Sequence, residues 1–345
     1  MLYMYQKVVG SGILIVGDIH FSDVYSGKHK DYLRNCFTVL GKIRDKVNEM
    51  KPAALVILGD IVGVTEGNVR NRETLYQLCT FFQDIRKVCK IYCVRGNHDF
   101  NGAFPEFQFL ASLGIFETSA SCDGYFDYFG TESQEVPEVR FHLMDYGSEH
   151  NELNIAKEPT VNIVLAHNNF TIQGLTTWYN AKGGIELGTM SNLRGVYMVI
   201  SGHIHNPSPQ LIMTSMVSGD DCLLFYPGCP TRPSQDQRYD NCWYVEFNYD
   251  KSSNTTSYQA TPFALEPAKD IFYDDEDFIE DKTEEELAEI ERKEALKELL
   301  DDIMASRITT GDLVGQVRAV AGASDEAKEI AIGYLQAAID SRVSK

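Results

Sequence analysis

Side chains that bind metal ions follow five short apolar runs in this sequence. The runs end in the motifs GDIH (17–20), GD (59–60), GNHD (96–99), AH (166–167) and GHIH (202–205). Carboxylate and amide oxygens mixed with imidazole nitrogens, without a thiolate, suit manganese or iron and disfavour a structural zinc site. Two adjacent divalent cations held by such ligands can activate water for attack on a phosphate ester. The motifs therefore predict a hydrolytic centre that holds two metal ions.

The spacing of these residues predicts how the ligands are shared. Asp18 and His20 lie just beyond a predicted strand, so their side chains can converge on one cation if the backbone stays extended. Asp60 can bridge two cations, because a carboxylate has two oxygens. The other predicted ligands are Asn97, His167, His203 and His205. A lone histidine at a strand end is more often structural than a ligand, but five of the eight histidines lie in these motifs.

Two residues next to Asn97 are predicted to be catalytic rather than ligands. His98 could protonate the leaving oxygen or stabilise the charge that grows on the phosphate. Asp99 could orient His98. The alternative is that His98 only packs beneath the site.

Short segments rich in β-branched residues precede the motifs and predict buried strands. They are 13–17, 53–59, 91–96, 161–166 and 196–202, and two aromatic candidates follow at 222–228 and 242–249. Residues 32–50 and 75–85 carry apolar side chains at helical spacing, which predicts helices between the first three strands. This alternation indicates an α/β fold, in which ligand sites lie at the carboxyl ends of the strands.

The composition changes near residue 262. Residues 266–302 hold 17 acidic and 5 basic side chains, so this segment carries most of the net charge of −19. Thr283 and Glu286 match a capping box that opens a long helix. We expect three parts: a catalytic domain (1–262), an acidic linker (263–282) and a helical region that docks on a partner (283–345). The mildly acidic body does not favour binding to DNA and does not exclude it.

The sequence predicts a cytoplasmic protein with reduced cysteines. No apolar run approaches the roughly 18 residues that a membrane span needs. A cleavable signal peptide is not expected, because a single Lys7 precedes the apolar run at 13–16 that leads into the first motif. Cys89 and Cys93 form the closest cysteine pair, and no second pair completes a zinc site.

The order GDxH, GD, GNHD, H and GHxH resembles the calcineurin-like metallophosphoesterase superfamily over roughly residues 10–250. The resemblance implies a β-sandwich flanked by helices, with two metals at the strand ends. It also implies three ligand sets: Asp18, His20 and His205 for one metal; Asn97, His167 and His203 for the other; and Asp60 as the bridge. His98 would be the catalytic histidine. The expected metal is Mn²⁺, with Fe²⁺ and Mg²⁺ as alternatives.

Two further features are similar to a subgroup of that superfamily. The loop YPGCPTRPS (226–234) and the helical tail after an acidic linker resemble SbcD-type DNA repair nucleases and the phage recombination endonuclease subunits. This resemblance implies a DNA substrate, an SMC-like ATPase bound through the C-terminal helices, and a possible homodimer.

Three functions remain open from the sequence. The first is a DNA nuclease subunit of a repair or recombination complex, and the second is a hydrolase of a small phosphoester such as a cyclic nucleotide or phosphomonoester. The third is a scaffold with an inactive site. A protein phosphatase is disfavoured, because Gly63 and Asp99 stand where that class usually has an arginine signature and a glutamate.

Overall fold

The computed structural model describes most of the chain between residues 7 and 264. The described residues are 7–10, 12–23, 31–63, 69, 71–100, 106–130, 132, 135–172, 184–208, 212–217, 219–231, 241–250 and 255–264. All of them belong to the first of two units into which the chain divides, Met1–Phe278. The predicted docking helices at 283–345, the predicted linker beyond 264 and residues 232–234 of the loop lie outside the described residues.

One sheet has five strands in the order β14-β13-β2-β3-β4. Their bounds are β2 (Ile13–Val16), β3 (Ala54–Ile57), β4 (Lys90–Cys93), β13 (Asn241–Asp250) and β14 (Thr255–Ala264). Strands β2, β3 and β4 run parallel, while β13 pairs antiparallel with β2 and β14. The motif residues after the three parallel strands therefore leave this sheet at the same edge.

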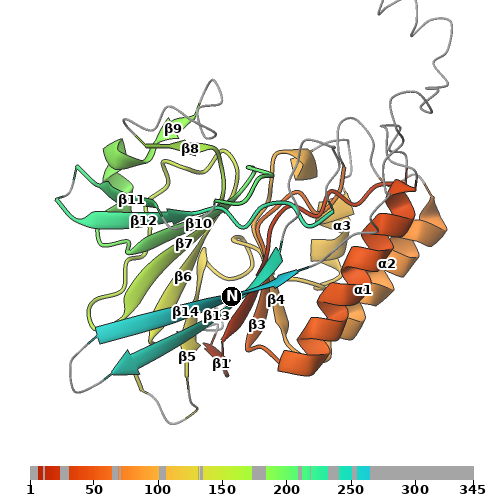
Figure 1. Cartoon of the computed structure of the whole chain (residues 1–345), viewed down its shortest axis with the longest axis horizontal. Coiled ribbons are helices and arrows are strands. Elements are labelled where there is room, and N and C mark those ends of the chain that lie inside the picture. The colour runs from red at the N-terminus through yellow and green to blue at the C-terminus, as the bar shows by residue number, and fades with distance from the viewer. Residues whose placement is uncertain are drawn as a thin grey trace, which may run out of the picture. The chain divides into compact units, whose positions relative to one another are not determined.

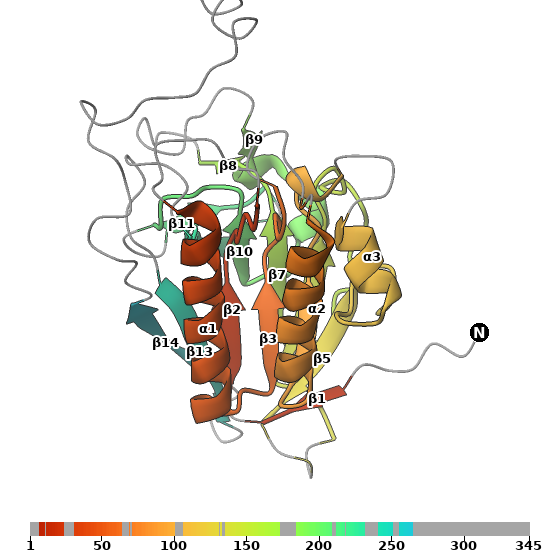
Figure 2. The ribbon, with the colours of Figure 1, turned by 90° about the vertical axis from the view of Figure 1, so that its right-hand side faces the viewer.

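Helices cover one face of the five-stranded sheet. They are α1 (Tyr32–Met50), α2 (Arg72–Arg86) and the shorter α3 (Glu106–Ser112). Figure 2 shows α1 and α2 side by side in front of β2 and β3. Both long helices begin at a residue whose side chain accepts a backbone N–H, Asp31 for α1 and Asn71 for α2, which stabilises a helix start by about 1 kcal/mol. Their buried stripes pack on the sheet as one apolar cluster.

The second sheet has seven strands in the order β1-β5-β6-β7-β10-β12-β11. Their bounds are β1 (Lys7–Val9), β5 (Tyr125–Phe129), β6 (Val139–Met144), β7 (Val161–His167), β10 (Met198–Gly202), β11 (Ile212–Ser215) and β12 (Asp221–Phe225). A two-stranded sheet, β8 (Phe170–Thr171) with β9 (Ile185–Glu186), and the 3₁₀ turns η2 (Leu187–Thr189) and η3 (Ser191–Leu193) lie beyond it. A third turn, η1 (His98–Phe100), follows β4.

The two large sheets pack face to face and enclose an apolar core. Figure 1 shows the layers in sequence, with helices on the right, the five-stranded sheet in the middle and the seven-stranded sheet on the left. Tyr92 from β4 stacks on Phe126 from β5 with ring centroids 3.8 Å apart, and Phe126 stacks on Phe141 from β6 at 5.0 Å. The contact between Tyr92 and Phe126 joins the two sheets and fixes the distance between them, and with it the distance between the motifs that each sheet carries. Phe126 and Phe141 pair within the seven-stranded sheet.

The predicted α/β sandwich with flanking helices is confirmed within the described part of the chain. All seven predicted strands and both predicted helices are present, although β14 continues to Ala264, past the predicted boundary at 262. The strands β1, β5, β6, β8, β9, β11 and β14 and the short helix α3 were not predicted. Among the described residues, no helix is both long and apolar enough to cross a bilayer.

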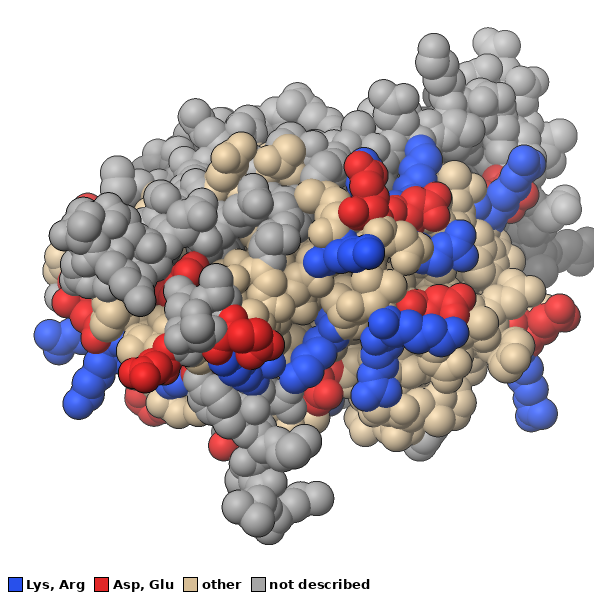
Figure 3. Space-filling model, turned by 90° about the horizontal axis from the view of Figure 1, so that it is seen from below, with Lys and Arg blue, Asp and Glu red and all other residues tan. Residues whose placement is uncertain are grey.

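Charges of both signs share the face of the domain seen from below in Figure 1. Lysine and arginine side chains are interspersed there with aspartate and glutamate among the described residues of this face (Figure 3). This face gives a polyanion no broad basic surface to bind.

The stacked aromatic side chains of the core generate a stability prediction. Phe126→Ala removes a fully buried ring, and we expect the free energy of unfolding to fall by about 3–5 kcal/mol. Tyr76→Ala is the control, because Tyr76 is 72% exposed and should change stability by less than about 0.5 kcal/mol. Urea denaturation measures both. An equal effect of the two substitutions would contradict the packing described here.

Candidate metal centre

The structure brings all the predicted ligands together. The motifs follow β2, β3 and β4 of one sheet and β7 and β10 of the other, so they meet where the carboxyl ends of both sheets come together. Three groups have ligand atoms that lie within 4.8 Å of one another: Asp18, His20 and His205; His20, Asp60 and His98; and Asp60, His167 and His203. The predicted residues therefore form one continuous cluster.

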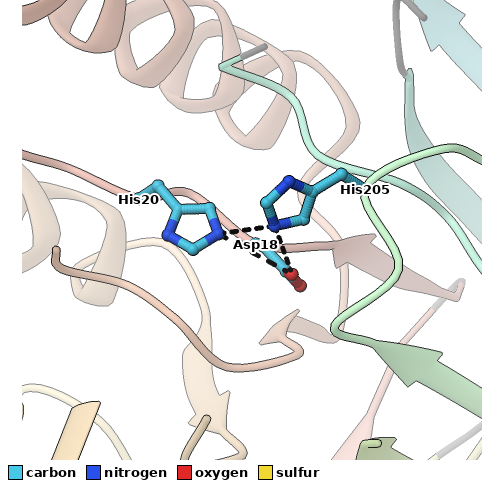
Figure 4. A group of neighbouring side chains, drawn as sticks. All are labelled: Asp18, His20 and His205. Carbon is cyan, nitrogen blue, oxygen red and sulfur yellow. Dashed lines mark hydrogen bonds and ion pairs between the residues drawn. The ribbon is translucent and has the colours of Figure 1, made fainter. Parts of the chain in front are cut away.

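Asp18, His20 and His205 form one half of this cluster (Figure 4). The Nε2 atoms of His20 and His205 lie 2.8 Å apart, and they lie 3.9 Å and 3.5 Å from Asp18 Oδ2. The sticks in Figure 4 show the three side chains pointing toward one another from the loops after β2 and β10. Three ligand atoms thus face a common point.

Asn97, His167 and His203 form the other half. Asn97 Oδ1 lies 3.1 Å from His167 Nε2 and 2.9 Å from His203 Nδ1. Asp60 lies between the halves: its Oδ2 is 3.2 Å from His167 Nε2 and 3.8 Å from His20 Nε2. A carboxylate that bridges two cations would occupy this position.

Hydrogen bonds behind the cluster orient its histidines. His20 Nδ1 lies 2.5 Å from the carbonyl oxygen of Gly63, and His167 Nδ1 lies 2.7 Å from that of Leu58. A carbonyl oxygen can only accept, so both Nδ1 atoms are donors, and in a neutral ring Nε2 then presents its lone pair to the cluster. The second nitrogen of a metal-binding histidine commonly makes such a bond.

Acceptors therefore face acceptors inside the cluster. The lone pair of His167 Nε2 faces Asp60 Oδ2 and Asn97 Oδ1, neither of which carries a proton when the carboxyl group is ionised. Buried acceptors that face one another are unfavourable unless a positive charge lies between them. The residues of the cluster thus fit divalent cations, which prefer oxygen and imidazole ligands of this kind.

The pKa values reflect the same demand for positive charge. Burial lowers the pKa of His203 to about 4 and that of His205 to about 3, so both are neutral and able to bind metal at pH 7. Burial alone would also lower the pKa of His167, but the carboxylates of Asp18 and Asp60 outweigh it and raise that pKa to about 9. Burial raises the pKa of Asp18 to about 7. Without metal, the raised pKa values of His167 and Asp18 favour protons on these two residues, in the place of a cation.

Unusual backbone conformations aim the ligands inward. His20, Asp60 and His203 have φ angles of 50°, 46° and 73°, a left-handed region that few residues other than glycine adopt. Strain of this kind, of order 1–3 kcal/mol for each residue, persists where the surrounding structure enforces it, and it clusters at functional sites. Three of the predicted ligands are held in this strained conformation.

Glycines let the loops approach the ligands closely. A Cβ atom at Gly96 would collide with the Asp60 carboxylate, and one at Gly59, where φ is 94°, would collide with the ring of His167. Any larger side chain at these positions would displace a ligand. The glycines in the motifs therefore belong to the architecture of the centre.

His98, the predicted catalytic residue, lies next to His20 and Asp60 of the cluster. Its backbone N–H donates to Asp60 Oδ1 at 2.8 Å, and its ring packs edge-on against His20 with centroids 5.1 Å apart. Its Nδ1 is buried and has no hydrogen-bond partner among the described residues. Its ring also lies near enough to His20 and Asp60 to join a ligand group.

Asp99 lies elsewhere than predicted. Its oxygens accept the backbone N–H groups of Ile61 at 3.0 Å and Gly96 at 2.9 Å, so both of its carboxylate oxygens are directed at backbone groups and not at the His98 ring. Asp99 is fully buried, and burial raises its pKa to about 8. Its contacts join the loops after β3 and β4, so it positions Asp60 and Asn97 rather than orienting His98.

The loop after β12 contributes a support that the sequence analysis did not identify. The hydroxyl of Thr231 donates to the carbonyl oxygen of the residue before His20 at 2.6 Å, and the Tyr32 hydroxyl donates to the carbonyl oxygen of His20 itself at 2.8 Å. Cys229 N donates to the carbonyl oxygen of His205 at 3.0 Å. The loop thus fixes two ligands through their backbones, which no motif spacing could reveal.

The sequence comparison identifies the family. The profile of the family described as calcineurin-like phosphoesterase matches residues 12–207, a span that contains every ligand of the cluster. The chain belongs to this family. It is a metal-dependent phosphoesterase, and its aspartates and histidines form a centre for two divalent metal ions.

Comparisons with individual proteins give less information about function than the family profile does. No curated protein sequence matches the chain. Among solved structures, a dimetal phosphatase from Danio rerio is 14% identical with a TM-score of 0.45, over 76% of this chain and 99% of that chain. A Staphylococcus aureus protein provisionally described as a 5′-nucleotidase, in complex with alpha-ketoglutarate, is 13% identical with a TM-score of 0.42, over 81% and 57%. At this level of likeness, neither structure indicates the substrate.

The raised pKa values of His167 and Asp18 predict how metal binding depends on pH. A cation must displace the proton that His167 binds below pH 9, so the affinity for Mn²⁺ should fall about tenfold for each unit below that pH. Below pH 7 the fall should steepen, because Asp18 then also binds a proton. Titration calorimetry at pH 6, 7 and 8 measures the effect. An affinity that does not change with pH would contradict the protonation described.

Proposed function

We propose that the chain hydrolyses phosphodiesters with two cations in this cluster. The proposed ligands are Asp18, His20 and His205 for one cation, Asn97, His167 and His203 for the other, and Asp60 for both. When bound, the cations supply Lewis acidity at the phosphate and lower the pKa of the attacking water. The protein holds the ligands in place through Asp99, Thr231 and the buried carbonyl groups described above.

The charges around the metal centre are the observation that supports a phosphodiester as the substrate. The principal charged neighbours of the titratable ligands are one another and His98, and in the described part of the chain none of these neighbours is a lysine or arginine. The substrate phosphate must then be neutralised mainly by the metal ions themselves.

The net charge of the metal-loaded centre distinguishes phosphodiesters from phosphomonoesters as substrates. Two divalent cations bring four positive charges, and Asp18 and Asp60 balance two of them. The attacking water leaves one negative charge when it loses its proton, so the single charge of a diester brings the centre to neutrality. A monoester, which carries about two negative charges at neutral pH, would leave the centre negative. A buried site disfavours such an excess.

DNA is the diester that we favour as substrate. The resemblance of the loop 226–234 and of the acidic and helical tail to SbcD-type nucleases supports this choice. The face seen in Figure 3 offers DNA no broad cationic area, and we also propose that residues 283–345 dock on an SMC-like ATPase that supplies much of the affinity. Cationic contacts dominate non-specific binding to DNA. Mn²⁺ is the metal we propose, with Fe²⁺ or Mg²⁺ as alternatives.

A small phosphodiester is the second candidate substrate. The observation in its favour is a cavity of about 760 Å³ that includes Asn97 in its lining. A cavity of this volume suits a small organic ligand.

A set of four substrates tests the proposed function. With Mn²⁺, the full chain should hydrolyse bis(p-nitrophenyl) phosphate with a higher kcat/KM than p-nitrophenyl phosphate, and it should release nucleotides from linear double-stranded or single-stranded DNA. Chelation of the metal should abolish all of these activities. Faster turnover of the monoester would refute the diesterase, and activity on small diesters without any on DNA would favour the second candidate.

Replacement of His98 tests its proposed role in proton transfer or charge stabilisation. His98→Ala should keep two bound metal ions per chain and lower kcat by about 10²–10⁴, the usual effect of losing a general acid. Elemental analysis of the purified variant and turnover of bis(p-nitrophenyl) phosphate measure the two effects. Loss of a metal ion together with activity would identify His98 as a ligand instead.

A further inference from the structure

The cavity beside the metal centre has an aromatic lining. It lies between the turn before β5 and the segment that follows β6, and it includes Asn97, Tyr125 and Tyr146. Asn97 also faces His167 and His203 in the metal cluster. A group bound in the cavity would therefore be continuous with a phosphate bound at the metals.

Tyr146 forms the wall between the cavity and the metal cluster. Its ring centroid lies 6.0 Å from that of His203 and 6.4 Å from that of His167, and the residue is 41% exposed. Its backbone N–H donates to the carbonyl oxygen of Arg95 at 2.9 Å, which ties it to the strand end that leads into Asn97. A large exposed aromatic ring is thus held next to the ligands.

Tyr125 is held from the seven-stranded sheet. The Arg140 guanidinium lies over the Tyr125 ring, 4.1 Å from its centroid, a distance at which a cation and an aromatic ring attract each other. Arg140 in turn donates two hydrogen bonds to the buried carboxylate of Asp127, at 2.7 Å and 2.8 Å. The paired contacts fix the orientation of the guanidinium and, with it, that of the tyrosine.

The charges around the cavity disfavour an additional anion. Asp123 and Glu152 are exposed carboxylates in its lining, and Asp145 accepts the backbone N–H of Arg95 at 2.8 Å. Arg95 is the one cationic side chain among the lining residues. Three carboxylates against one cation make the cavity a poor site for a second phosphate and a better one for an uncharged group with hydrogen-bond donors.

We propose that this cavity binds the nucleoside next to the scissile phosphate, and that Tyr146 stacks on its base. The inference rests on the proposed phosphodiesterase activity and names the part of the substrate that the enzyme selects. An aromatic wall suits a base, since every base has a π-face, and carboxylate acceptors suit its N–H groups. Tyr146 is then a residue that determines specificity and does not take part in the chemical step.

A pair of esters with the same leaving group tests the proposal. With Mn²⁺ and the full chain, kcat/KM is measured for the p-nitrophenyl ester of deoxyadenosine 5′-phosphate and for methyl p-nitrophenyl phosphate, which lacks the nucleoside. Tyr146→Ala should lower the ratio of the two values about tenfold or more, mainly through the KM of the nucleoside ester. Tyr146→Phe should keep the ratio, because it keeps the ring. Tyr76→Ala, on the exposed face of α2, is the matched control and should keep it too.

The alternative results separate this proposal from the proposed function. A ratio that is unchanged in Tyr146→Ala, or that falls equally in Tyr146→Phe, would overturn the stacking role while leaving the diesterase intact. If neither ester is hydrolysed, the proposed function fails, and the cavity is then tested by saturation-transfer NMR with deoxyadenosine. Signal transfer in the wild-type chain that is lost in Tyr146→Ala would support the cavity as a nucleoside site. No transfer in the wild-type chain would overturn it.

Discussion

The convergence of unprotonated acceptors on one buried place is the constraint that governs this structure. Carbonyl groups behind His20 and His167 hold the Nδ1 protons of these rings, so their Nε2 lone pairs must face carboxylate and amide oxygens. Such an arrangement is unfavourable without positive charge. Two divalent cations satisfy it. Without them, the carboxylates of Asp18 and Asp60 raise the pKa of His167 to about 9, so that its ring binds a proton at neutral pH.

The rest of the fold stabilises this unfavourable arrangement. Three ligands stay in left-handed conformations, and Gly59 and Gly96 leave no room for a side chain. The ring of Tyr92, stacked on that of Phe126, holds β4 at a fixed separation from β5 and thus keeps the motifs of the two sheets within reach of each other. A well-packed core of this kind can hold strained loops in place, because interiors resist deformation.

The ligands were predictable from the sequence because each motif follows an apolar run, and four of the five motifs begin with a glycine. This local pattern marks the carboxyl end of a buried strand. Strands β5 and β6 were missed, because Asp127 and Arg140 interrupt their apolar pattern, and only the structure shows that these two residues pair. The roles of Asp99, Thr231 and Tyr146 were not predictable either. Each depends on a partner that the fold brings from a distant part of the chain.

In the proposed metal centre, the carboxylate of Asp60 lies between two metal ions and binds both. Anomalous diffraction from crystals grown with Mn²⁺, recorded at the manganese absorption edge, tests it most directly. Two peaks about 3.5–4 Å apart are expected, one on each side of the Asp60 carboxylate. A single peak, or a pair of peaks that does not flank Asp60, would contradict it.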